Sequence, residues 1–143
     1  MSARASCNAA ALRQAARRVS QLYDEALAPA GIGINQFSIL AALRDAGPSR
    51  IADLARELVM DRSTLGHLVR PLEERGLVSL TVDADDRRAR TLSLTRAGRA
   101  TLAKAGPLWM QAQRRFESAF GKGASAEMRD VLRRVAAVEF GNE

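Results

Sequence analysis

The chain has 143 residues, which is long enough for one domain with a hydrophobic core and too short for two ordinary domains. Apolar residues make up 47% of the sequence but aromatic residues only 4%, so the core must consist mainly of Leu, Ala and Val, as in packed helices. The formal net charge of +6 favours an anionic partner such as nucleic acid, although a coding bias would also explain why 20 of the 22 basic residues are arginine.

The first predicted helix spans residues 8–28, where apolar side chains recur at intervals of three or four positions. These positions are Leu12, Ala15, Ala16, Val19, Leu22, Ala26 and Leu27. Pro29 and Gly31 are expected to end the helix, because proline and glycine both disfavour its continuation.

The uncharged run 26–43 has the length of a membrane span, but several residues interrupt it: Pro29, Gly31, Gly33, Asn35 and Gln36. The run therefore predicts a helix end, a turn and a new helix. The first twelve residues contain no apolar core of signal-peptide length, and one cysteine cannot form an internal disulfide. We expect a cytoplasmic protein that does not enter a membrane.

Two further helices are predicted before residue 60. Asn35 can cap the second helix, which Gly47 and Pro48 are expected to stop. A short third helix follows. The residues expected to face inward are Phe37, Leu40, Ala41 and Leu43 in the second helix and Ile51, Leu54, Ala55 and Leu58 in the third.

The fourth predicted helix begins after Asp61, a favourable N-cap residue, and stops at Gly76. Its apolar stripe consists of Leu65, Leu68, Val69 and Leu72. Pro71 lies inside this pattern and lacks a backbone donor, so it is expected to bend the second half of the helix.

Two strands are predicted next, at residues 77–82 and 91–95, because apolar and polar residues alternate in both. The loop between them holds three aspartates and three arginines. Thr95 is expected to cap a long helix that reaches Phe120 with a kink at Pro107, and "GKGAS" separates it from a last helix. That helix carries Met128, Val131, Leu132, Val135 and Val138. The order predicts a mostly α fold with a small β-hairpin wing, a winged helix-turn-helix.

The outward face of the fourth helix carries the candidate chemistry. Since each residue advances a helix by about 100°, the apolar stripe places Ser63, His67 and Arg70 on the opposite side. Hydroxyl groups near a helix start can approach phosphates or base edges, and Arg and His can donate to purine acceptors. Arg62 and Thr64 flank this face and are expected to contact phosphates. The alternative is an ordinary solvated helix face, and the basic loop that follows favours DNA binding.

No motif supports an enzyme or a metal site. A Ser-His-Asp triad at His67 would lie on an exposed helix face without a pocket, and one histidine lacks partner ligands for a metal. Gly31 and Gly33 lack the third glycine and the preceding strand of a dinucleotide-binding loop. We therefore expect no catalytic residue, no metal and no cofactor.

Residues 51–98 resemble the multiple antibiotic resistance regulator (MarR) family of winged-helix transcription factors. The strongest parts are "DRSTLGHLVRPLEERGLV", at the recognition helix and its exit, and the wing pattern "DRRARTLSLT". The wing pattern runs from Asp86 to Thr95, and Gly98 follows as in the family. The flanking helices are compatible with the family over nearly the whole chain.

The resemblance implies that Arg88 enters the DNA minor groove beside the recognition helix, with Arg87 and Arg90 on the same loop. Arginine suits a narrow A·T-rich groove, where the negative potential is enhanced. Asp86 would brace the wing through its backbone or an arginine. The acids would thus hold the arginines in place and reduce the entropy lost on binding. The alternative is a solvated loop that keeps the hairpin edge from pairing with other chains.

The expected organisation is a single MarR-like domain over residues 1–143. The winged helix-turn-helix lobe is expected at 34–98, with its recognition helix at about 61–75 and its wing at about 77–95, and dimerisation helices at 8–30 and 100–141. The expected function is that of a homodimeric transcriptional repressor of a pseudo-palindromic operator in double-stranded DNA. A winged-helix module for protein interaction, without an operator, is the alternative.

The resemblance also implies release from DNA by a small-molecule effector, aromatic or phenolic, held between the first, second and fifth helices. The residues expected there are Arg17, Tyr23, Phe37, Ser38 and Trp109. Cys7 has two interpretations. Some relatives sense peroxides through a cysteine in the first helix, but they pair it with several tyrosines, whereas this chain has one. A small buried residue in the dimer region is the favoured interpretation.

Overall fold

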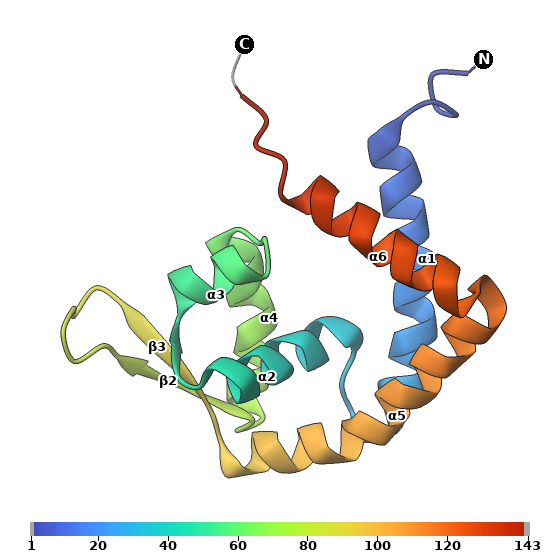
Figure 1. The fold of residues 1–143 in the computed structure, drawn as a ribbon. Helices are drawn as coiled ribbons and strands as arrows, with labels where there is room; N and C mark the ends of the chain where they lie inside the picture. Colours follow the sequence, from blue (N-terminus) through green and yellow to red (C-terminus); the bar gives the residue numbers. More distant parts are fainter. Residues whose placement is uncertain (1, 142–143) are drawn as a thin grey trace.

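The computed structural model describes residues 2–141 and shows a winged helix-turn-helix lobe from which the first helix and the last two helices project (Figure 1). The elements are α1 (Asn8–Leu27), a 3-10 turn η1 (Ala28–Ala30), α2 (Ile34–Ala46), β1 (Ser49–Arg50), α3 (Ile51–Glu57), α4 (Arg62–Glu74), β2 (Val78–Val82), β3 (Arg90–Leu94), α5 (Arg96–Phe120) and α6 (Lys122–Ala136). The predicted fold class, mostly α with a small β-hairpin wing, is confirmed.

The wing is an antiparallel hairpin of β2 and β3, in which Val78 pairs with Leu94 and Val82 with Arg90. Both strands begin and end within one residue of the prediction. The structure adds β1, which pairs with β3 and makes the sheet order β1-β3-β2. A strand of two residues is too short to show an alternating pattern, so the sequence could not predict it.

One hydrophobic core holds the lobe together, with α2, α3 and α4 packed around the sheet and the first half of α5. The predicted apolar stripes supply much of it, although Ile39, which was not predicted to face inward, is fully buried, and Phe37 and Ala41 are only partly buried. Its largest fully buried side chains are Leu27, Ile39, Leu40, Leu43, Leu54, Leu65, Leu72, Leu92 and Val78. Leu27, from the end of α1, belongs to the same core. The core therefore joins the start of the chain to the lobe that carries the wing.

The caps of two predicted helices are confirmed and that of a third is wrong. Asp61 Oδ1 accepts from the Thr64 backbone N–H at 2.7 Å, and Thr95 Oγ1 accepts from the Gly98 N–H at 3.0 Å. Asn35 is not the cap of α2, because Gly33 occupies that position. The carboxylate of Asp24, on α1, accepts from the Ile34 N–H at 2.8 Å and satisfies the helix start from outside the helix.

The boundary between α5 and α6 and the end of α6 differ from the prediction. α5 contains Pro107 and changes direction along its length in Figure 1. Only Gly121, at φ 106°, separates α5 from α6, so most of "GKGAS" lies inside α6 and does not form a break. α6 ends at Ala136, which leaves Val138 beyond the helix. Gly121 supplies the left-handed conformation that allows so short a turn.

Among residues 2–141, no single helix has both the length and the apolarity needed to cross a membrane. Only α1 with η1 and α2, taken together across a bend of 70°, reach that length and composition. Within α2, Ile39, Leu40 and Leu43 are buried in the core of the lobe.

Candidate nucleic-acid interface

The outward face of α4 presents five exposed polar side chains, as the helical spacing predicts: Arg62, Ser63, Thr64, His67 and Arg70. One of them is already engaged. The Thr64 hydroxyl donates to Asp61 Oδ2 at 2.9 Å, and together with the Thr64 N–H it lowers the pKa of the Asp61 carboxyl. Thr64 therefore completes the helix cap, while the other four side chains make no hydrogen bond to the described part of the protein.

The wing loop, residues 83–89, is organised by Asp83. Its carboxylate accepts from the Arg50 guanidinium at 3.0 and 3.1 Å, in a bidentate pair that connects β1 to the wing. The same carboxylate accepts from the backbone N–H groups of Asp85 at 2.9 Å and Asp86 at 3.1 Å, and from the Thr91 hydroxyl at 3.2 Å. One side chain thus fixes the turn, the following strand and the neighbouring element.

Electrostatics favour the ionised form of this carboxyl. The hydrogen bonds from Arg50, followed by that from the Asp85 N–H, lower the pKa of Asp83 to about 2. Asp83 in turn raises the pKa of the Arg50 guanidinium. Only 13% of the Asp83 side chain is exposed, against 43% for Arg50, so the carboxylate is enclosed and the arginine forms its outer wall.

Asp86 and the loop arginines have different partners from those of Asp83. Asp86 Oδ1 accepts from the Arg88 backbone N–H at 3.0 Å, which is the backbone brace that the resemblance implies. The Arg90 guanidinium donates to the carbonyl groups of Arg87 at 3.2 Å and Ala89 at 3.4 Å. The acids therefore hold the backbone of the loop, and none of the ion pairs in residues 2–141 involves the guanidinium groups of the loop arginines.

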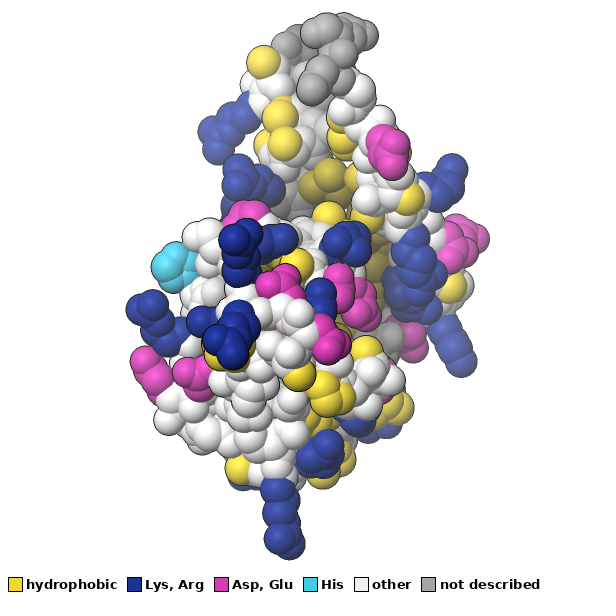
Figure 2. Space-filling view, turned by 90° about the vertical axis from the view of Figure 1, so that its left-hand side faces the viewer, with side chains coloured by type: hydrophobic (Ala, Val, Ile, Leu, Met, Phe, Trp, Pro, Cys, Tyr) yellow, Lys and Arg dark blue, Asp and Glu magenta, His cyan; other side chains and the backbone are white. Residues whose placement is uncertain are grey.

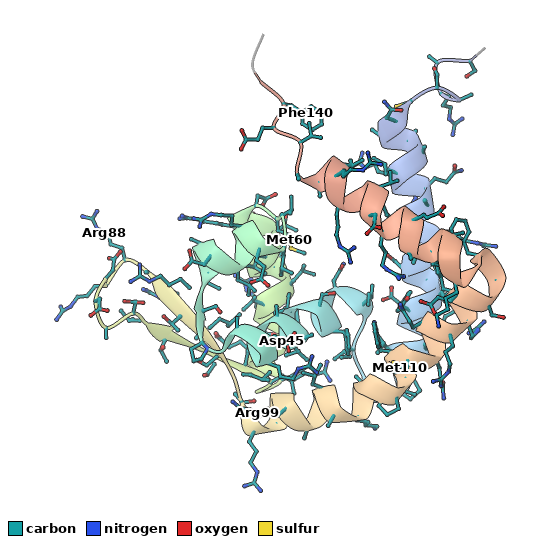
Figure 3. All side chains as sticks on the ribbon, in the orientation of Figure 1. Asp45, Met60, Arg88, Arg99, Met110 and Phe140 are labelled. Atoms are coloured by element: carbon teal, nitrogen blue, oxygen red, sulfur yellow. The ribbon has the colours of Figure 1, made fainter. Side chains whose placement is uncertain are left out.

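The wing and the recognition helix border a common groove. It has a volume of about 510 Å³ and is lined by the start of α3, the start of α4 and the wing. Its charged lining consists of Arg50, Arg56, Arg62, Arg88 and Arg90 with the carboxylates of Asp53 and Asp86. Figure 2 faces the wing side and shows basic side chains spread over it with acidic ones between them. Figure 3 shows Arg88 extending from the wing tip away from the helices.

The structure brings two of the five candidate effector residues, Phe37 and Trp109, into contact. Phe37 and Trp109 stack with ring centroids 6.0 Å apart and pack against the core. The Tyr23 hydroxyl donates to Gln113 on α5, and burial, followed by the charge of Glu117, raises the pKa of Tyr23. The Ser38 hydroxyl, next to Phe37 on α2, donates to the Ile34 carbonyl, and Arg17 lines a hollow together with Arg4.

Cys7 is exposed in the single chain, where it precedes the first residue of α1. The expected burial is therefore not found within one chain. Residues 2–141 contain no cluster of three or more His, Cys, Asp and Glu side chains that could hold a metal ion.

Two residues that organise the wing were not predicted from the sequence. Arg50 lies in β1, which shows no periodic signal, and Asp83 was one of three similar acids in the loop. The contact of Asp83 with Thr91 is a diagonal one across the hairpin, because Thr91 pairs with Thr81 and the Asp83 N–H donates to the Ala89 carbonyl.

A capped helix with an exposed polar face, joined to a braced basic hairpin, defines a winged helix-turn-helix protein of the DNA-binding class. The model of the MarR family matches residues 32–89, and the structural similarities extend over nearly the whole chain. The chain belongs to the MarR family, whose members are transcriptional regulators and not enzymes.

Three relatives show the extent of the similarity. The transcriptional repressor NicR of Pseudomonas putida is 36% identical over 91 residues, which cover 64% of this chain and 58% of NicR. The chain thus spans little more than half the length of that curated relative. The regulator MosR of M. tuberculosis, solved in complex with DNA, has a TM-score of 0.81 at 31% identity and covers 94% of this chain and 100% of its own. CouR of Rhodococcus jostii, solved with p-coumaroyl-CoA, has a TM-score of 0.79 at 25% identity, with 99% and 100% covered.

Proposed function

We propose that the chain is a homodimeric, sequence-specific repressor that binds a pseudo-palindromic operator and leaves it when a small-molecule effector binds. The observation that carries the proposal is the pairing of the exposed face of α4 with a wing whose backbone is fixed by Asp83 and Asp86. A fixed wing loses little conformational entropy on binding DNA. The complex of MosR with DNA supports the same use of this fold.

In this proposal α4 lies in the major groove and the wing tip reaches the adjacent minor groove. Ser63, His67 and Arg70 face base edges, because they are exposed and make no hydrogen bond to the protein. Arg88 enters the minor groove, where its charge meets the enhanced negative potential of a narrow A·T-rich segment. The residues of the common groove, including Arg62, lie near the phosphates between the two sites.

The proposed effector is an aromatic or phenolic compound that binds near the stacked rings of Phe37 and Trp109. These rings join α2 of the lobe to α5, so a ligand that separates them would change the angle between the lobe and the projecting helices. The p-coumaroyl-CoA bound to CouR is an aromatic ligand of this kind.

A direct test selects bound sequences from a random pool of DNA duplexes and measures their affinity by fluorescence anisotropy. Enrichment of two inverted half-sites supports the proposal. Enrichment of no sequence, with weak binding to every duplex, would instead favour the protein-interaction module that lacks an operator.

Dimerisation is the first prediction, because one chain leaves many large apolar side chains of the projecting helices and the C-terminal segment exposed. They include Leu12, Phe120, Val131, Leu132, Val135, Val138 and Phe140. A second copy would cover them and would set two α4 helices one DNA turn apart, roughly 34 Å, with half-site centres about 10 base pairs apart. Sedimentation at micromolar concentration should show a dimer, and a monomer alone would contradict this geometry.

The second prediction separates the wing from the recognition helix. Arg88→Ala should lower the affinity, flatten the salt dependence by about one unit and weaken the preference for A·T-rich flanks. His67→Ala should instead relax the preference at one base pair, at a cost of about 1–3 kcal/mol for the favoured base, with little change in the salt dependence. Both side chains are exposed, so thermal unfolding should stay unchanged. Identical effects of the two variants in titrations across salt concentrations would contradict the separate roles.

A further inference from the structure

Gly66 lies in the middle of α4 on the exposed surface of the recognition helix. Glycine is, after proline, the least favourable residue in a helix interior, and alanine is the most favourable. Apart from its chain neighbours and the adjacent backbone of α4 itself, a Cβ added at Gly66 would meet no atom of the described protein within 4 Å. Nothing inside the described chain therefore requires a glycine at this position, although the helix is less stable because of it.

The other glycines inside helices are either explained by close packing or lie away from the proposed DNA surface. At Gly98 a Cβ would lie 2.0 Å from the Leu77 carbonyl oxygen, so packing explains that residue. Gly106 precedes Pro107 in α5, and Gly123 lies in the first turn of α6. Neither lies on α4 or on the wing. Gly66 is thus the helical glycine of residues 2–141 that faces the proposed DNA surface without an internal cause.

The neighbours of Gly66 are basic. Arg62 precedes it by four residues and Arg70 follows it by four, so the three residues form one row along the helix surface. Because Gly66 has no side chain, none covers the helix backbone between Arg62 and Arg70. Arg62 also lines the arginine-rich groove between the wing and α3, so this row begins at that basic surface.

We propose that the sugar-phosphate backbone of one DNA strand seats against Gly66, between the guanidinium groups of Arg62 and Arg70. The inference rests on the DNA-binding function proposed above and adds a residue that sets how deeply α4 enters the major groove. A methyl group at this position would keep the strand away from the helix. Ser63 and His67 would then lie too far from the base edges, since hydrogen bonds weaken steeply with distance and angle.

The test compares Gly66→Ala with Gly123→Ala, which makes the same chemical change in another helix where a Cβ also meets no atom within 4 Å. Both variants should unfold at a temperature equal to or above that of the wild type. Only Gly66→Ala should lose affinity, by roughly tenfold or more, the size of one lost base contact. A loss should appear on random duplexes, because a backbone contact carries no sequence information, and it should be larger on the selected duplex, where the base contacts of Ser63 and His67 are weakened as well.

Three other outcomes would overturn the inference, and each has a different meaning for the proposed function. If the wild type binds DNA and Gly66→Ala binds it with the same affinity, the close approach at Gly66 is wrong while the proposed function stands. A loss confined to the selected sequence would place a base edge, and not the backbone, at Gly66. A wild type that binds no duplex would remove the proposed function and this inference together.

Discussion

Gly98→Ala is expected to lower the free energy of unfolding by about 3 kcal/mol or more, at the upper end of the cost of overpacking. A Cβ at this position would lie 2.0 Å from the Leu77 carbonyl oxygen and 2.7 Å from Leu94 Cδ1. The carbonyl cannot move aside freely, because it accepts from the Thr95 N–H at 3.2 Å. The start of α5 would have to separate from the end of α4 and the start of β2.

The contact region around Gly98 and the Leu77 carbonyl also connects the fold to the proposed function. Thr95 Oγ1 donates to the Gly76 carbonyl at 2.6 Å while it accepts from the Gly98 N–H, so one hydroxyl joins the exit of α4 to the start of α5. A displaced α5 would also move the helices proposed to form the dimer. Gly98→Ala should therefore lose DNA affinity together with stability.

Urea unfolding monitored by circular dichroism measures the change, with Gly123→Ala as the control for a helical glycine that contacts nothing. The control should be as stable as the wild type or more so. Equal stability of Gly98→Ala and the wild type would show that the helix and the Leu77 carbonyl are not held as close as the structure has them.

The elements that the sequence predicted well are those whose signals are local. Asp61 and Thr95 cap their helices through hydrogen bonds to residues three positions ahead, and such bonds depend only on nearby sequence. The apolar spacing of α2, α3 and α4 predicted the core because one lobe buries all three stripes. Membership of the MarR family follows from the same stretch, since the family model matches residues 32–89.

The errors arise where distant residues decide the local structure. Asn35 has the chemistry of a cap, but Asp24, on the preceding helix, reaches the Ile34 N–H and moves the helix start. β1 exists because β3 offers it a partner, not because Ser49 and Arg50 have a strand pattern.

In the candidate site, too, some features follow from local sequence and others depend on residues distant in the chain. The exposed face of α4 follows from helical periodicity alone, whereas the choice among Asp83, Asp85 and Asp86 as the organiser of the wing requires the position of Arg50. Composition could show that acids accompany the loop arginines, but the contacts show that the acids hold the backbone and Arg50. The stacking of Phe37 on Trp109 is likewise a contact between helices far apart in sequence.

Asp83→Ala is expected to weaken DNA binding by roughly tenfold, although the substitution makes the protein more positive and its proposed partner is a polyanion. The variant loses the acceptor for Arg50, for two backbone N–H groups and for the Thr91 hydroxyl. The wing loop would then sample many conformations, and ordering it on DNA would cost entropy that the braced loop does not lose.

The control is Asp85→Ala, which makes the same change in charge in the same loop. The Asp85 carboxylate makes no hydrogen bond or ion pair with residues 2–141, and only the Asp85 backbone N–H contacts Asp83. Asp85→Ala should bind DNA as tightly as the wild type or slightly more tightly. Asp86→Ala should lie between the two, because it loses one hydrogen bond, to the Arg88 N–H.

At neutral pH, protonation of Asp83 does not affect the comparison between the wild type and the Asp→Ala variants. The pKa of Asp83 is lowered from 3.8 to about 2, so its contribution to stability is fully present above pH 3.8 and is lost as the pH falls through about 2. Asp83 is therefore ionised where DNA binding is measured. Anisotropy titrations across salt concentrations separate the two effects, because lost charge changes the salt dependence whereas a lost brace changes the affinity at every salt concentration. If Asp83→Ala and Asp85→Ala both bind more tightly than the wild type, the acids of the wing act only through charge and Asp83 does not position the wing for DNA.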